Sequence, residues 1–440
     1  MFNVKDFGAK GDGKTLDTKA VQAAIDACYE KGGGRVLISG GNFVLSTVHF
    51  RSNVEIHIEK GATVLGSKSP DDFEPIEEDA TNTVYQDRSH SYFHHSLFHA
   101  DSVSDIALTG LGKIDMQSIW EVQPGWNRGC KIVAFKNCTN VVIRDLTMRN
   151  ATDLAVYFAG CENVRVTGLD LLVHIDGISP DSCKNVVISD CIIDAGDDGI
   201  VPKSSFTLGK FKAMENLSIS NCVVKSRCNA IKFGTESNTA FINTTITGCT
   251  IYDTRYSGIA LECIDGALIE GFSVSNISMR NVGNPFMIIV MDRARGPEGT
   301  TVGEIRNISF SNITATGPYV AWEGPTWNYD CHTENDVTQM PITTPALIIG
   351  QKDSIIKNIS LSNIFLSLPG GGKESWKENP VPQVRQGYAE SIRYGRRPPA
   401  FGLIARDVDN LKLVNVEFVT EKEDARDAIY LENVTRFKNI

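Results

Sequence analysis

The chain has 440 residues, 42% of them hydrophobic, and a formal net charge of −10 at pH 7. This acidic balance argues against nucleic acid as the main partner, because a phosphate backbone is met by a basic surface. No apolar run approaches 18 residues, so we also expect no membrane partner.

Residues 1–50 are interpreted as an N-terminal cap and the first coil. The first element expected there is a helix, which forms the cap. The stretch GAKGDGKT, from Gly8 to Thr15, matches a phosphate-loop pattern. A phosphate loop needs alternating strands and helices around it, whereas the following sequence predicts strand after strand, so we set this function aside. The helix is predicted from apolar residues at helical spacing: Val21, Ala24, Ile25 and Cys28.

A repeat then runs along the rest of the chain. Short aliphatic strands each follow one polar or glycine residue, and Asn140, Asn163 and Asn185 show the shortest intervals, 23 and 22 residues. Repeats of this length, rich in Val and Ile, are typical of the coils of a parallel β-helix. We therefore predict one all-β domain over residues 1–440. The register residues are Asn53, Asp105, Asn140, Asn163, Asn185, Asn216, Asn243, Gly271, Asn307, Asn358 and Asn410.

Several cysteines follow the same register, which indicates columns of thiols along the solenoid. Cysteine is commonly a small buried residue, and the sequence has no CxxC pair with zinc spacing. We therefore interpret these residues as core and expect no metal site. The two columns are Cys138, Cys161 and Cys183, and Cys191, Cys222 and Cys249.

The stretch DAGDDGIVPKS places Asp197 and Asp198 between glycines in this otherwise apolar region. Counting 13 residues from successive register residues gives a column of Asp153, Asp176, Asp198 and Asn229. Stacked carboxylates repel one another, which a purely structural protein has no reason to keep. Further polar residues accompany the column: His174, Lys203, Arg227 and Lys232.

Two chemistries use clustered acids on such a surface, metal-dependent β-elimination and acid–base hydrolysis of a glycoside. In inverting hydrolysis one carboxylic acid protonates the leaving oxygen while a carboxylate activates water. Asp197, beside other acids, could keep its proton by like-charge repulsion and serve as the acid.

At these residues the sequence resembles glycoside hydrolase family 28, which includes polygalacturonases and rhamnogalacturonan hydrolases. The segments HIDGISPDSC and GDDGI resemble two motifs of the family, and the resemblance extends from FGAKGDGKT to GLIARDVDNLKL. It implies a right-handed parallel β-helix and inverting hydrolysis of a pectic glycan without a cofactor. It also implies that Asp197 is the general acid, and that Asp176 and Asp198 hold the attacking water.

Two departures from the family bear on the substrate. Asn229 replaces the family's histidine, and Ala260 and Glu262 align with a pair of basic residues that clamp a carboxylate. A glutamate there would repel a uronate in the leaving-group subsite, so we predict rhamnogalacturonan-type substrates over homogalacturonan, with Asp153 as an additional substrate contact. Exo-polygalacturonase activity is the nearest alternative.

Insertions between coils are expected at residues 318–345 and 368–402. The first carries Trp322 and Trp327, which we predict to stack on sugar rings or to pack on the solenoid.

A calcium-dependent uronate lyase or epimerase and a non-catalytic glycan-binding solenoid remain alternatives. The first residues contain no signal-peptide core, which predicts a cytoplasmic protein, or a secreted or periplasmic one whose signal has been removed.

Overall fold

The computed structural model describes residues 1–440 except 78–83, 119–128 and 322–340. Its contacts form two compact units. Unit 1 comprises Met1–Gly196 and Phe206–Lys212, and unit 2 comprises Asp197–Ser205 and Ala213–Ile440. The expectation of a single domain stays a prediction.

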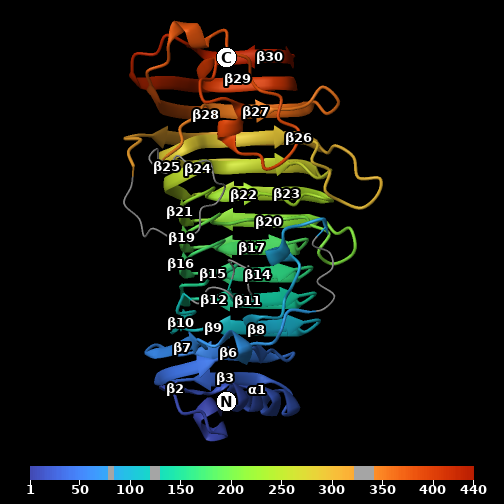
Figure 1. The fold of residues 1–440 in the computed structure, drawn as a ribbon, viewed down its shortest axis with the longest axis vertical. Coiled ribbons are helices and arrows are strands. Elements are labelled where there is room, and N and C mark those ends of the chain that lie inside the picture. The colour runs from blue at the N-terminus through green and yellow to red at the C-terminus, as the bar shows by residue number, and fades with distance from the viewer. Residues whose placement is uncertain (78–83, 119–128, 322–340) are drawn as a thin grey trace. The chain divides into compact units, whose positions relative to one another are not determined.

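Unit 1 consists of three stacks of parallel strands, in which each strand pairs with the one a coil earlier and a coil later (Figure 1). The first stack contains β1 (Phe2–Asn3), β3 (Gly34–Ile38), β6 (Val54–Ile58), β9 (Ser104–Thr109), β12 (Thr139–Arg144), β15 (Glu162–Thr167) and β18 (Lys184–Ser189). The second contains β2 (Asp12–Leu16), β4 (Gly41–Leu45), β7 (Ala62–Gly66), β10 (Lys113–Asp115), β13 (Thr147–Arg149), β16 (Asp170–Val173) and β19 (Ile192–Ala195). The third contains β5 (Val48–His49), β8 (Ser96–Asp101), β11 (Lys131–Lys136), β14 (Val156–Ala159) and β17 (Ile178–Asp181).

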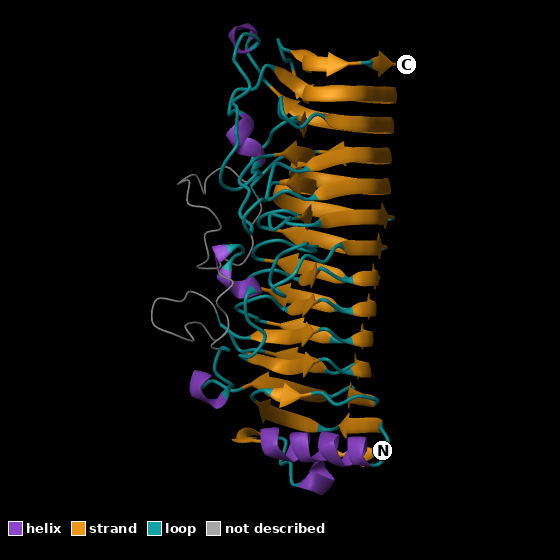
Figure 2. Cartoon of the chain, turned by 90° about the vertical axis from the view of Figure 1, so that its right-hand side faces the viewer, coloured by secondary structure: helices purple, strands orange, loops and turns teal. Residues whose placement is uncertain are grey.

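Unit 2 repeats this arrangement with longer strands that continue from one stack into the next (Figure 2). Its strands are β20 (Met214–Ser220), β21 (Val223–Ser226), β22 (Ile231–Phe233), β23 (Ala240–Thr247), β24 (Thr250–Cys263), β25 (Leu268–Val290), β26 (Glu304–Thr316), β27 (Ala346–Ile349), β28 (Ile356–Gly370), β29 (Ala400–Lys422), β30 (Asp427–Thr435) and β31 (Lys438–Asn439). One stack holds the candidate site: β22, β24, β25, β27, β29 and β30 pair in that order, and we call it the site sheet. All these pairings are parallel, which confirms the predicted parallel β-helix.

The one α-helix among the described residues is α1 (Thr18–Glu30), which buries the four predicted residues, Val21, Ala24, Ile25 and Cys28. It contacts β1, β3, β5 and β6, and its role as a cap stays a prediction. Short helical turns among the described residues include η1 (Val4–Phe7), η2 (Pro70–Asp72), η4 (Arg88–His90), η5 (Glu374–Trp376) and η6 (Ser391–Tyr394). None of the helices described is long and apolar enough to cross a membrane.

The loop that matches a phosphate-binding pattern already has an internal partner. The carboxylate of Asp17 accepts hydrogen bonds from the backbone N–H groups of Lys10, at 2.7 Å, and Gly11, at 2.9 Å. Asp17 is only 2% exposed. A phosphate would need the N–H groups that this carboxylate occupies, so the structure supports setting the nucleotide function aside.

The predicted register is confirmed by the backbone. All eleven register residues have φ between 56° and 74°, the left-handed region that Asn and Gly tolerate best. Their amides also form ladders: in unit 1 the Asn163 amide donates to Asn140 at 3.0 Å, and the Asn185 amide donates to Asn163 at 2.9 Å. In unit 2 the Asn358 amide donates to Asn307 at 2.8 Å.

The predicted cysteine columns are also buried. Cys138, Cys161, Cys183 and Cys191 in unit 1 are buried thiols, as are Cys222 and Cys249 in unit 2. The backbone N–H of Cys138 donates to the Cys161 sulfur at 3.3 Å. These thiols fill the interior beside the turns, which agrees with their interpretation as core.

The ladder predicts the effect of Asn163→Ala. This substitution removes two side-chain hydrogen bonds and leaves an alanine, which has no polar side chain to support it, in the left-handed region. We therefore expect the free energy of unfolding to fall by about 1 to 3 kcal/mol. Asn163→Gly keeps the backbone conformation accessible and should lose less. Thermal unfolding of both variants checks this, and equal losses would show that the backbone conformation is not the cause.

Candidate active site

In unit 1, two candidate residues lie in the turn between β16 and β17. The backbone N–H of His174 donates to Ala151 at 2.9 Å, and its Nε2 lies 3.0 Å from the Ser118 hydroxyl. Burial lowers the pKa of His174 to about 4, so the ring is neutral at neutral pH. Asp176 is 5% exposed and lies two residues before Ile178, the first residue of β17.

Asp153 occupies a different position from the one that a constant 13-residue offset predicts. Val156 pairs with Ile178, so Asp153 lies three residues before its strand whereas Asp176 lies two before. A shift of one residue turns a side chain to the opposite face. Accordingly, Asp153 is fully buried, accepts a hydrogen bond from the Tyr92 hydroxyl and lies 3.4 Å from the Lys131 ammonium. Its role in substrate binding stays a prediction, and its partners here are structural.

In unit 2, the acid pair directly precedes a strand-like segment. Gly199 and Ile200 follow Asp198, and Ile200 forms a β-bridge with Ile231 of β22. The backbone N–H and the side-chain amide of Asn229 both donate to Oδ1 of Asp198, each at 2.9 Å. Asn229 therefore fixes the orientation of this carboxylate, as the predicted column requires.

Lys232 sets the charge of Asp198. Its ammonium lies 2.6 Å from Oδ2 of Asp198. Burial by itself would raise the pKa of Asp198, but the charge and hydrogen bond of Lys232, together with those from Asn229, lower it below its ordinary value. Burial likewise opposes the Lys232 charge, yet the carboxylate of Asp198 raises the pKa of Lys232. Asp198 is therefore an ionised carboxylate at neutral pH.

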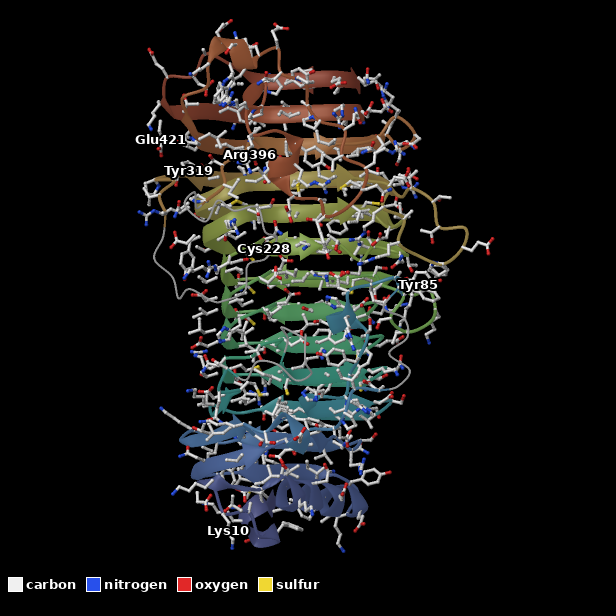
Figure 3. All side chains as sticks on the ribbon, viewed as in Figure 1. Lys10, Tyr85, Cys228, Tyr319, Arg396 and Glu421 are labelled. Carbon is white, nitrogen blue, oxygen red and sulfur yellow. The ribbon has the colours of Figure 1, made fainter. Side chains whose placement is uncertain are left out.

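Asp197, Asp198 and Cys228 are brought together, with one donor atom of each within 4.8 Å of the others. Figure 3 labels Cys228 within unit 2. Calcium is held by six to eight oxygens, whereas this group offers two carboxylates and a sulfur, and Lys232 already contacts one carboxylate. The donor set does not fit calcium, and independence from metals remains our expectation.

Glu262 requires a correction to the electrostatic argument made from the sequence. It is 2% exposed on β24, and its Oε2 has no hydrogen-bond partner among the described residues. Burial raises the pKa of Glu262 to about 8, only partly offset by Lys232. A protonated glutamic acid does not repel a uronate, so the predicted repulsion loses its physical basis at neutral pH. Burial could not be read from the residue type.

Lys203 lies in a network of buried charges in unit 2. Its ammonium donates to the carbonyl of Gly234 at 3.0 Å and to Glu236 at 2.7 Å, and Arg295 lies 2.6 Å from the same glutamate. In this structure Lys203 holds a turn after β22. Arg227 is partly buried next to Cys228, and its role in substrate binding stays a prediction.

The aromatic residues predicted to stack on sugars, Trp322 and Trp327, lie outside the described residues.

Sequence reasoning missed two members of the site column, Ser257 and Asn284. The backbone N–H of Ser257 donates to Oδ1 of Asn229 at 3.0 Å, and Ser257 pairs with Asn284. Both lie two residues before a paired residue of the site sheet. Counting back from the strand, instead of forward from the register residue, would have found them.

Parallel stacked strands with a buried acid pair at a strand start define a parallel β-helix with a candidate acid–base site. The family model for glycosyl hydrolases family 28 matches residues 41–365. The chain therefore belongs to this family and is a glycoside hydrolase.

The chain is also similar to curated proteins and, in fold, to a solved structure. The chain is 22% identical to an exo-poly-alpha-D-galacturonosidase of Dickeya chrysanthemi, over 87% of this chain and 74% of that protein. It is 28% identical to a probable polygalacturonase of Vitis vinifera, over 46% of this chain but only 44% of that protein's length. The family 28 exopolygalacturonase of Yersinia enterocolitica shares the fold, with a TM-score of 0.71 at 19% identity, over 99% of this chain and 78% of that one.

The protonated state of Glu262 predicts a pH dependence of stability. The folded state keeps this proton up to about pH 8, whereas an exposed glutamic acid releases it near 4.5. The unfolded state thus binds fewer protons between these values, so this group makes the free energy of unfolding fall as pH rises through the window. Glu262→Gln removes this dependence.

As pH rises from 5 to 8, the free energy of unfolding of Glu262→Gln should increase relative to that of the wild type by about 1 to 4 kcal/mol, since one pKa unit corresponds to about 1.4 kcal/mol. Melting temperatures measured across that range check this, with the exposed Glu298→Gln as the matched control. A Glu262→Gln profile parallel to that of the wild type would show that Glu262 is ionised in the folded protein.

Proposed function

We propose that this protein hydrolyses glycosidic bonds in a galacturonate-containing pectic chain, with polygalacturonan as the first candidate substrate. The observation that carries the proposal is the buried pair Asp197 and Asp198, in which Lys232 and Asn229 keep one member ionised. An acid that holds its proton beside an ionised carboxylate is the arrangement that glycoside hydrolysis uses. The polygalacturonase names of the relatives support the choice of substrate.

In this proposal Asp197 is the general acid. The negative charge of Asp198 favours the protonated form of its neighbour, and Asp197 gives that proton to the glycosidic oxygen as the bond to the anomeric carbon breaks. Asp198 accepts a proton from the water whose oxygen attacks the anomeric carbon. The participation of Asp176 in holding this water stays a prediction from the sequence resemblance.

Inversion at the anomeric carbon also stays a prediction. Inverting hydrolases commonly separate their two carboxyl groups by about 6.5 to 9.5 Å. The donor atoms of Asp197 and Asp198 are within 4.8 Å, so this pair alone does not specify inversion. Proton NMR of the anomer released first decides the outcome.

A rhamnogalacturonan-type substrate is the second candidate. It is favoured by the absence of basic side chains at Asn229, Ala260 and Glu262, where the family's polygalacturonases carry a histidine and a carboxylate clamp. The neutral state of Glu262 weakens the argument without reversing it. Hydrolysis rates on homogalacturonan and rhamnogalacturonan oligosaccharides of equal length separate the two candidates.

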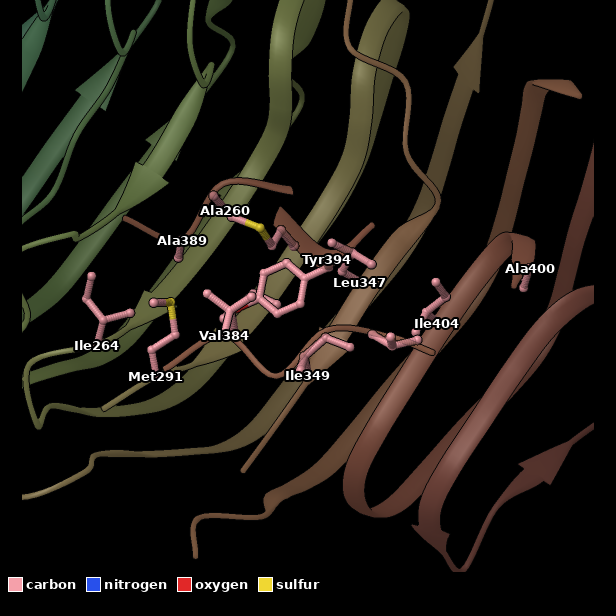
Figure 4. Packing of buried hydrophobic residues seen from close by; sticks show 13 residues of the cluster. Ala260, Ile264, Met291, Leu347, Ile349, Val384, Ala389, Tyr394, Ala400 and Ile404 are labelled. Carbon is pink, nitrogen blue, oxygen red and sulfur yellow. The ribbon is translucent and has the colours of Figure 1, made fainter. Parts of the chain in front are cut away.

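We also propose attack at a chain end. The segment 381–394 of the second predicted insertion covers part of the site sheet, because its apolar residues form one buried cluster with residues of β24, β25, β27 and β29 (Figure 4). Its Val384 and Tyr394 belong to this cluster together with Leu347, and the buried Arg406 donates to the carbonyl of Val381 at 2.8 Å. A glycan following the site sheet would meet this cover. The product profile tests the proposal, because attack at chain ends releases one short product from the outset.

The acid assignment predicts the effect of Asp197→Asn. Its amide cannot donate a proton to the leaving oxygen, so we expect kcat to fall at least about a hundredfold with little change in melting temperature. Asp71→Asn, at an exposed aspartate, is the control. Turnover of Asp197→Asn close to that of the wild type would assign the acid to another residue.

The hydrolytic mechanism predicts saturated products and activity that survives a chelator. We expect reducing sugar to be released without the ultraviolet absorbance of an unsaturated uronate, because water breaks the bond and no elimination takes place. Loss of activity in chelator that calcium restores, together with unsaturated products, would establish the lyase alternative. An unchanged glycan in every assay would leave the binding alternative.

A further inference from the structure

The acid pair is the start of a column that continues along the site sheet of unit 2. Asp198, Asn229, Ser257 and Asn284 each lie two residues before a paired residue of this sheet. The amide of Asn284 then donates to the Thr344 hydroxyl at 3.1 Å. Each step is one inter-strand spacing of about 4.8 Å. The column therefore connects the acids to more distant coils along a single edge.

A pocket of about 240 Å³ lies on this edge. Thr344 belongs to its lining and to the column. So does Phe401, which lies two residues before Leu403, the partner of Ala346. Tyr256, beside Ser257, lines the pocket on the side toward the acids. Tyr256 packs against Cys228, whose sulfur is within 4.8 Å of both acids.

The lining of the pocket has the chemistry of a sugar site. Phe401 offers an aromatic face at a partly buried position, and the rings of Trp376 and Tyr256 also line the pocket. The guanidinium groups of Arg397 and Arg426 lie over the Trp376 ring. Charged groups come from Glu390 and Arg396 on the second insertion, and from Arg426, which is paired with Asp424. Aromatic rings pack on the apolar face of a pyranose, a guanidinium group binds its carboxylate, and a protein carboxylate accepts hydrogen bonds from its hydroxyl groups. The volume is below that of drug-sized pockets, about 300 Å³ upward, and suits a single ring.

We propose that this pocket is a subsite for one pyranose ring of the glycan, separated from the scissile bond by at least one other ring. Tyr256 is two steps of the column from Asp198, or roughly 10 Å, and the remainder of the pocket is farther. Arg396, which is exposed and labelled in Figure 3, contacts the carboxylate of a galacturonate in this subsite. This inference rests on the proposed function.

Arg396 and its neighbour Arg397 provide a matched pair of variants. Both are exposed arginines, but only Arg396 lines the pocket, whereas Arg397 lies 5.9 Å from the Trp376 ring. The experiment measures KM and kcat for galacturonate oligosaccharides of two to six rings. We expect Arg396→Ala to raise KM for the longest oligosaccharides about tenfold or more relative to the disaccharide, with Arg397→Ala close to wild type.

Binding is measured separately by calorimetry with the Asp197→Asn protein and unlabelled oligogalacturonates. Adding Arg396→Ala should weaken the binding of long oligosaccharides more than that of the disaccharide. If the wild type hydrolyses these oligosaccharides but both arginine variants give the same chain-length dependence as the wild type, the subsite proposal is wrong. If the wild type neither hydrolyses nor binds any pectic oligosaccharide, the proposed function itself fails.

Discussion

Each unit of this protein depends on the pairing of one coil's backbone with the next. A parallel strand satisfies its N–H and C=O groups only if the following coil returns in register. The left-handed turn at every register residue makes this return possible, and Asn tolerates that conformation while its amide binds the Asn one coil away. The same constraint stacks the inward Val and Ile side chains and the buried thiols into the core of each unit.

Stacking also explains how charged groups come to be buried in the site. Residues at one position of successive coils are about 4.8 Å apart, so a carboxylate always has neighbours in its column. In unit 2 these neighbours stabilise one ionised carboxylate, since Asn229 and Lys232 both bind Asp198. Glu262, buried nearby without a hydrogen-bond partner for Oε2 among the described residues, takes up a proton instead. Among buried carboxylates, the partners available at each position thus decide whether the group is ionised or neutral.

The second insertion connects the fold to specificity. Its apolar residues, including Val384 and Tyr394, pack on the site sheet, and the guanidinium of Arg406 in β29 donates to the backbone carbonyl of Val381. Because this packing fixes η6 and the residues after it, Glu390 and Arg396 are held beside Thr344 and Phe401. The insertion is thus part of the folded core of unit 2 and brings to the column side chains that no coil supplies.

The sequence alone determined the parallel coils, the register residues, the buried face of α1 and the family, because each depends on local spacing or on motifs such as GDDGI. It also placed Asn229 beside Asp198. Tertiary structure decided what depends on burial and on distant segments. Asp153 faces Lys131 because its coil is shifted by one residue, and Glu262 is neutral because it is buried. The pocket at Tyr256 exists only where residues some 140 positions later fold back over β24, and no local pattern encodes such a contact.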